Sequence, residues 1–188
     1  SDFTTFQEKS DKLLRRVGFA RAKSINGPWK RSDQPLIETE SNNPAILQDG
    51  EKIWLMYRDA DLRIYLANAD SIDGIFSMVN DNVWPACKLE DFYLYKSDSL
   101  VHMICEDNVG GISGEIRWGV HLTSSNNLNS WQIGEPLVAY DHTIRFTNGS
   151  KLKCKRRERP QLLIEDNKIT YLITSVYDGE DSWCQPVK

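Results

Sequence analysis

A repeated segment constrains the fold of this chain more than any other feature of its sequence. Residues 17–29 align without gaps on residues 64–76, and residues 119–131 form a third copy with one inserted residue. Each copy reads as a strand, a polar turn and an aromatic residue that closes onto the next strand. The repeat therefore predicts a chain built from copies of one β unit.

A second unit recurs between these copies, an inner hairpin of two apolar strands. Its copies span residues 44–57, 92–104 and 160–173. Together, hairpin and outer segment recur after about 47 to 55 residues, and a four-stranded sheet with such a period is a propeller blade. A β-sandwich is the main alternative, but it does not predict a repeat of this kind. We therefore predict an all-β propeller.

The blades can be placed along a single domain. Residues 15–37 read as the outer half of a blade, 41–85 and 88–140 as two blades, and 156–188 as the start of a further blade. About three blades do not close a ring, which usually takes roughly four or more. We therefore expect a partial propeller whose remainder comes from a longer chain, with a second copy or an open ring as alternatives. A short helix is expected around residues 6–14.

Composition argues against several classes of partner and site. The 188 residues carry a net charge of -4, which argues against a nucleic-acid partner. No apolar run reaches the roughly 18 residues that span a bilayer, so no membrane partner is expected. The four cysteines (Cys87, Cys105, Cys154 and Cys184) form no closely spaced pair, so no metal site of the zinc type is expected. Cys105 lies in an apolar strand and is expected to be a buried thiol.

Three short motifs fall where the innermost strand of each blade begins. They read Asn-Asn-Pro at residues 42–44, Glu-Asp-Phe at 90–92 and Glu-Arg-Pro at 158–160. Innermost strands surround the propeller axis, so their leading ends meet at one mouth. We therefore expect carboxylates from two of the three motifs to converge there.

Paired carboxylates are what glycoside hydrolysis requires. One protonates the leaving oxygen while another attacks the sugar or activates water, and a third can tune the acid through its charge. Glu158 lies among five cations (Lys153, Lys155, Arg156, Arg157 and Arg159), so a structural ion-pair hub is the alternative reading of this stretch.

The order and spacing of these motifs resemble the five-bladed propeller glycoside hydrolases of families 43, 32, 68 and 117, and family 43 most. The likeness is carried by residues 18–31, 42–44, 89–92 and 156–160, within a stretch from about residue 16 to about residue 175. Family members typically read Gly-Pro-Trp at the outer turn, Glu-Asp-Pro at one inner strand and Glu-x-Pro at a later one.

The resemblance implies catalytic roles for two residues. Asp91 matches the aspartate that stabilises the transition state and tunes the acid, and Glu158 matches the general acid. The base aspartate of the family belongs to a first blade that is not represented here. Asn43 stands on the second blade and offers no carboxylate, and Phe92 replaces the usual proline.

Further residues are predicted to bind substrate, each with a core or solvated position as the alternative. Arg58 at a strand end can hold sugar hydroxyls through charge-assisted hydrogen bonds, and Trp118 is a candidate pocket aromatic. The full set is Arg58, Asn43, Glu90, His102, Arg157, His142 and Trp118. Trp29, Phe76 and Trp131 recur at one repeat position and are expected in the core, whereas Glu106 and Glu115 are expected to be solvated.

These observations favour a glycoside hydrolase, exo-acting on a plant or algal poly- or oligosaccharide. The alternatives are a non-catalytic carbohydrate-binding or assembly propeller that lacks the base, and a purely structural β-domain. The resemblance requires no cofactor but implies a structural calcium at the propeller axis, for which His142 is a candidate ligand. A periplasmic or secreted location is favoured.

Overall fold

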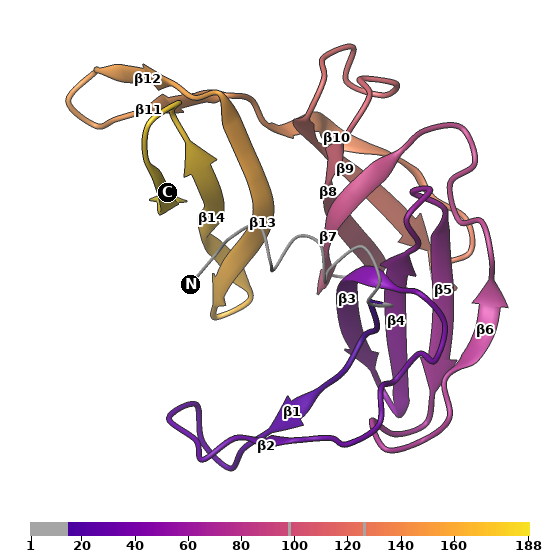
Figure 1. Ribbon diagram of the computed structural model, residues 1–188. Coiled ribbons are helices and arrows are strands. Elements are labelled where there is room, and N and C mark those ends of the chain that lie inside the picture. The colour runs from indigo at the N-terminus through magenta and orange to yellow at the C-terminus, as the bar shows by residue number, and fades with distance from the viewer. Residues whose placement is uncertain (1–14, 98, 126) are drawn as a thin grey trace, which may run out of the picture. The chain divides into compact units, whose positions relative to one another are not determined.

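The structure is a computed structural model that describes residues 15–97, 99–125 and 127–188, and it is all-β there, as predicted (Figure 1). The helix expected at residues 6–14 lies outside the described residues. Within these ranges no helix is long and apolar enough to cross a membrane. The chain divides into two compact units, Ser1–Asn42 and Asn43–Lys188.

Within residues 15–42, the part of the first unit that the structure describes, β1 (Ala20–Arg21) pairs with β2 (Lys30–Arg31) in a small hairpin. The strand expected at the start of the repeat at residues 17–29 is therefore much shorter than predicted. Trp29, expected in the core, is instead 59% exposed. Strands of two residues offer no broad apolar face, and the Trp29 indole is held locally by a hydrogen bond from its Nε1 to the carbonyl of Ile25.

A four-stranded antiparallel sheet follows, in the order β3 (Asn42–Asp49), β4 (Lys52–Arg58), β5 (Ile64–Ala69) and β6 (Ser77–Asn80). Consecutive apolar residues in β4, Leu55, Met56 and Tyr57, are all buried. Successive side chains in a strand point to opposite faces, so this sheet is covered on both faces at β4.

The second sheet has the same order of strands: β7 (Leu89–Ser97), β8 (Leu100–Asp107), β9 (Trp118–Ser125) and β10 (Gln132–Tyr140). Strand β10 is continuous, although its pairing register with β9 shifts between Ile133 and Val138. Trp131, just before β10, is buried as expected.

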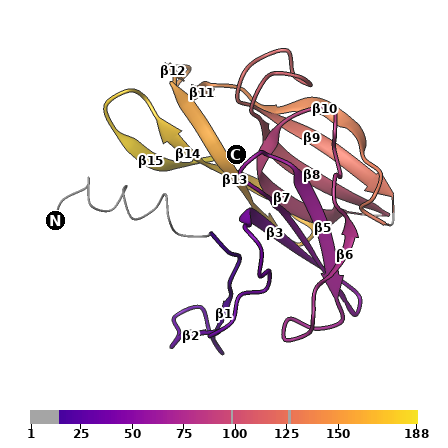
Figure 2. The same ribbon diagram turned by 45° about the vertical axis from the view of Figure 1, so that its right-hand side comes forward.

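The remaining strands form a hairpin and a third sheet. The hairpin of β11 (Thr143–Arg145) and β12 (Lys151–Lys153) precedes a sheet in the order β13 (Arg156–Glu165), β14 (Lys168–Tyr177) and β15 (Ser182–Val187). Strand β13 lies beside β7 of the second sheet (Figure 2). The inner strands of neighbouring sheets are thus adjacent.

One apolar core joins the first two sheets. It includes side chains from β4, β5, β7, β8 and β9, among them Met56, Leu66, Leu89, Met103 and Leu122. Cys105 belongs to this core and is fully buried, as predicted. A smaller cluster of Ile144, Cys154 and Val176 lies under the third sheet.

Candidate active site

The inner strands share an unusual backbone feature at their leading ends. Asn43 in β3, Asp91 in β7 and Arg159 in β13 have φ values of 46°, 54° and 55°. In β7 and β13 the pairing register shifts at these residues, between Glu90 and Tyr93 and between Glu158 and Gln161, which marks a β-bulge. Bulges bend a strand and redirect its side chains. The three aligned sequence motifs therefore coincide with one repeated backbone geometry.

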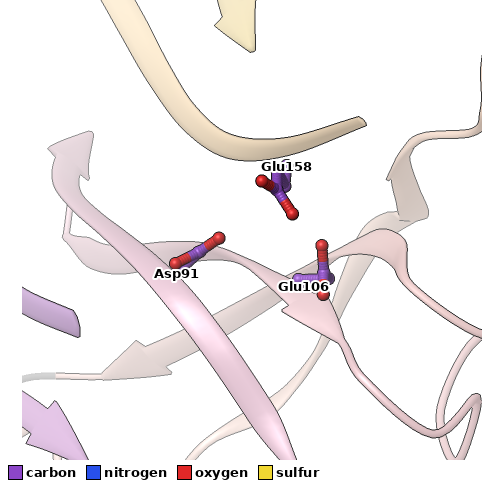
Figure 3. A group of neighbouring side chains, drawn as sticks. All are labelled: Asp91, Glu106 and Glu158. Atoms are coloured by element: carbon purple, nitrogen blue, oxygen red, sulfur yellow. The ribbon is translucent and has the colours of Figure 1, made fainter. Parts of the chain in front are cut away.

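Three carboxylates meet beside two of these bulges. Asp91 from β7, Glu106 from β8 and Glu158 from β13 each offer an oxygen within 4.8 Å of the other two (Figure 3). Their side chains are 8%, 1% and 17% exposed, respectively. The structure thus brings Asp91 and Glu158 together, and Glu158 is the member of the group most open to solvent.

Glu106 was expected to be solvated, and that expectation is wrong. Strand β8 extends to Asp107, two residues beyond the apolar run that predicted it, and this carries Glu106 into the interior. The guanidinium of Arg117 compensates its charge, with Nε 2.8 Å from Oε1 of Glu106. Sequence reasoning also missed Arg117, which precedes β9 and gave no signal of its own.

A chain of ion pairs connects Glu106 to the first sheet. Arg117 Nη2 lies 2.9 Å from Oε1 of Glu90, and Arg58 Nη2 lies 2.7 Å from Oε2 of the same carboxylate. Arg58 and Glu90 were predicted to bind substrate. In the structure each oxygen of Glu90 contacts a guanidinium group, and the pair with Arg58 links β4 to β7. Binding of substrate by Arg58 and Glu90 stays a prediction.

Asp91 is held from both sides at its bulge. Asn43 Nδ2 donates a hydrogen bond to Oδ1, and Arg159 Nε lies 3.9 Å from Oδ2. Burial raises the pKa of Asp91, Arg159 opposes that shift, and the charges of Glu90 and Glu158 add to it.

Glu106 has the most strongly shifted acidity of the group. Burial raises its pKa to about 8, Arg117 opposes the shift, and the charges of Glu90 and Asp91 add to it. The network supports this direction, because four carboxylates (Glu90, Asp91, Glu106 and Glu158) face three guanidinium groups (Arg58, Arg117 and Arg159). Glu106 has the least exposed side chain of these carboxylates, so burial disfavours its charged form the most.

His102 lies elsewhere on the second sheet. Its ring stacks on Tyr95 with centroids 4.7 Å apart, and Nδ1 lies 2.9 Å from Nε2 of His121. Four residues separate His102 from Glu106 along β8, a distance of roughly 13 Å at the rise of a strand. The structure therefore places His102 in an aromatic stack and not beside the three carboxylates.

Arg157 and Trp118 line a separate cavity of about 470 Å³, to which Tyr140 and Asp141 also contribute but none of the three carboxylates does. Arg157 is buried and donates to Thr174 Oγ1 and to the carbonyl of Asp141. It follows from strand alternation that Arg157 and its neighbour Glu158 face opposite sides of β13.

A structural calcium stays a prediction. Carboxylate oxygens are the ligands that Ca²⁺ prefers, and the group of Asp91, Glu106 and Glu158 supplies three of them. His142 is differently engaged, because its Nε2 lies 3.0 Å from the carbonyl of Arg117 and must donate its proton there. The carboxylates, rather than His142, would hold such an ion.

Comparison with known proteins shows which fold surrounds this site. No family model and no curated protein matches the sequence. Among solved structures, the chain superposes on an endo-1,4-β-xylanase from Bacteroides thetaiotaomicron (TM-score 0.62, 16% identity, 93% of this chain and 60% of that chain). It also superposes on an α-L-arabinofuranosidase from Podospora anserina in complex with cellotriose (TM-score 0.60, 13% identity, 88% and 61%).

A family 43 endo-arabinanase from Bacillus licheniformis matches as well (TM-score 0.55, 15% identity, 91% of this chain and 63% of that chain). The chain thus spans about 60% of the length of these solved structures. At such low identity the likeness establishes the architecture. This chain has the β-propeller fold of the family 43 glycoside hydrolases and their relatives, with about three blades represented.

Proposed function

We propose that this chain carries the acid side of a glycoside hydrolase site that cleaves a plant or algal poly- or oligosaccharide. The observation that carries the proposal is that Asp91 and Glu158, at the starts of β7 and β13, lie close to Glu106, at the end of β8. Solved proteins of the same fold are named as arabinofuranosidase, xylanase and arabinanase, which supports a carbohydrate substrate. We also propose that cleavage is exo-acting, that is, from the end of the glycan chain. Exo-acting cleavage predicts a monosaccharide as the sole early product.

Each carboxyl has a distinct part in this proposal. Glu158, the most exposed of the three, protonates the oxygen of the leaving sugar. Asp91, whose carboxylate lies within 4.8 Å of that of Glu158, stabilises positive charge that develops on the sugar ring in the transition state. Glu106 is too buried to touch a substrate, so its part is to hold the position and charge of the other two.

The proposal is tested by replacing the acid. Glu158→Gln removes the transferable proton with little change of shape, and we expect sugar release from arabinan, xylan or 4-nitrophenyl glycosides to fall by roughly 10²–10⁴-fold. Glu165→Gln, at the exposed end of the same strand, is the matched control and should leave the rate unchanged. Normal turnover by the Glu158→Gln protein would overturn the assignment.

A non-catalytic carbohydrate-binding propeller is the second candidate. It is favoured because none of the three carboxylates, whose oxygens lie within 4.8 Å of one another, stands at the roughly 6.5–9.5 Å from Glu158 that the base of an inverting enzyme requires. Asn43, at the head of β3, supplies an amide and no further carboxylate. This candidate predicts that calorimetry detects binding of arabino- or xylo-oligosaccharides to the chain while no substrate is hydrolysed.

A further inference from the structure

A cavity of about 280 Å³ opens beside Glu158 on the third sheet. That volume is near the lower end of small-ligand pockets, roughly 300–1,000 Å³, and corresponds to about nine water molecules at ~30 Å³ each. It therefore suits a single sugar residue. Its charged lining side chains are Arg156, Glu158 and Arg159.

The strand register explains why these side chains share the cavity. Glu158 pairs with Ser175 and Ser175 with Cys184, while Arg156 pairs with Tyr177 and Tyr177 with Ser182. Paired residues lie on the same face of a sheet, and residues two apart in a strand do so as well. One face of β13–β15 thus presents Arg156 and Glu158 side by side, with hydroxyls from β14 and β15 around them.

The two arginines keep most of their hydrogen-bonding capacity. Arg156 is exposed and forms no ion pair or side-chain hydrogen bond with any residue that the structure describes. Arg159 lies 3.6 Å from Glu158 and 3.9 Å from Asp91, which are the long separations of loose ion pairs. Guanidinium groups bind carboxylates and sulfates through paired N–H donors, so both remain able to take an anion.

The backbone of Arg159 gives a second and independent observation. Its φ of 55° is similar to those of Asp91, at the bulge in β7, and of Asn43, at the head of β3. Asn and Asp tolerate this left-handed conformation, whereas a long side chain such as Arg is held there at a cost of about 1 kcal/mol. A strained residue beside a candidate site indicates that its side chain serves a purpose there.

The charges of the lining side chains indicate which ligand fits. The lining holds two guanidinium groups and one carboxylate, and Arg156, which has no ion-pair partner among the described residues, leaves a positive charge there even though Arg159 is shared with Glu158 and Asp91. A neutral sugar would leave this charge uncompensated, whereas an acidic sugar would neutralise it.

We propose that this cavity is a subsite for a sugar that carries an anionic substituent, a carboxylate or a sulfate ester, bound by Arg156 and Arg159 next to Glu158. The inference rests on the proposed function, because it makes acidic glycans the substrate class of the same site. A carboxylate and a sulfate ester both present a compact oxyanion on a sugar ring. The probes used in the test distinguish between these two groups.

The test titrates the 188-residue chain with three matched probes: D-galactose, D-galacturonate and D-galactose 6-sulfate. Calorimetry should show at least one charged sugar binding about tenfold or more tightly than galactose, with affinity falling as salt is added. A preference between the two charged probes identifies carboxylate or sulfate as the source. Equal affinity for all three, or no binding of either charged sugar, overturns the proposal.

Two variants locate the binding. Arg159→Gly and Arg156→Gln should each weaken binding of the charged sugar by about tenfold or more, since each removes charge-assisted hydrogen bonds. Arg159→Gly also relieves the positive φ, so its melting temperature should be equal to or above that of the parent. Lys168→Gln, which removes a cation outside the cavity, is the control. Unchanged affinity in both arginine variants overturns the assignment.

This readout is separate from hydrolysis. Binding of galacturonate by a protein that hydrolyses nothing would leave the subsite standing and overturn the proposed enzyme. Glu158-dependent hydrolysis of neutral arabinan, with no binding of either charged sugar, would support the proposed enzyme and overturn the subsite.

Discussion

The side-chain amide of Asn43 donates a hydrogen bond to the carboxylate of Asp91, and so ties the head of β3 to the head of β7. Both residues have a positive φ, and Asp91 lies at a β-bulge. Asn43→Gly removes the donor but suits the backbone, so the expected loss, about 1.5–3 kcal/mol of unfolding free energy, reports the bond to a charged group. Urea denaturation measures it.

Asn167 provides the matched control for this substitution. It is exposed in the turn between β13 and β14 and has a φ of 59°. Asn167→Gly should change the unfolding free energy by less than about 0.5 kcal/mol. Equal effects at the two positions would mean that the contact with Asp91 contributes nothing.

Arg117 is expected to be the most sensitive member of the ion-pair chain. Above about pH 8, where Glu106 is ionised, Arg117→Met leaves the buried Glu106 and one oxygen of Glu90 without their cation, and removal of one partner from such a pair costs about 3–5 kcal/mol. Adding Glu106→Gln should restore part of this loss, because the uncompensated charge is gone. Arg63→Met breaks an exposed pair with Asp81 and should cost less than about 1 kcal/mol.

The stability of the protein should fall between about pH 5 and pH 8. Glu106 has a pKa of about 8 in the folded chain against 4.5 for an ordinary glutamate, so the folded state binds the extra proton across this window. Its contribution is complete below about pH 4.5 and is lost as the pH rises through 8, at up to ~1.4 kcal/mol per pH unit. Asp91, whose pKa is also raised, acts in the same direction.

Urea denaturation at pH 5.5 and pH 8.5 checks this dependence. Glu106→Gln should flatten it, since glutamine does not titrate, whereas Glu115→Gln at an exposed site should not. Stability that is flat or rising across this range in the parent protein would contradict the raised pKa of Glu106.

Gly119 is expected to tolerate no side chain. A Cβ there would lie 2.1 Å from the ring of Tyr140, and that ring is buried and cannot move aside. Gly119→Ala should therefore destabilise the chain by about 1–3 kcal/mol or more, as overpacking does. Gly18→Ala, where nothing lies within 4 Å of the new methyl, should leave the stability nearly unchanged. Thermal denaturation of both variants and of the parent protein measures the difference.

The propeller fold could be predicted because its signals are local. Alternating apolar residues and turn residues repeat along the chain, and each repeat can be recognised without its neighbours. Strand ends were less predictable. β7 begins at Leu89 and β13 at Arg156, earlier than expected, because ladder pairing extends these strands through polar residues that break the apolar pattern.

The candidate site was only partly predictable. Alignment of the inner strands predicted that Asp91 and Glu158 would meet, but Glu106 follows an apolar run, where a carboxylate is normally solvated. Its burial depends on Arg117, whose position only the folded chain reveals. Arg157 was grouped with Glu158 by proximity in sequence, although the two-residue period of a strand already separates their faces.

The repeated positive-φ position at the heads of β3, β7 and β13 has a consequence for how this scaffold can change. At one backbone position, three sheets display an amide, a carboxylate and a guanidinium, in Asn43, Asp91 and Arg159. The main chain sets the direction in which each group points, and the residue type alone sets its chemistry. A single substitution at one of these three positions can therefore add, remove or reverse a charge where the inner strands begin, while the strand itself keeps its conformation.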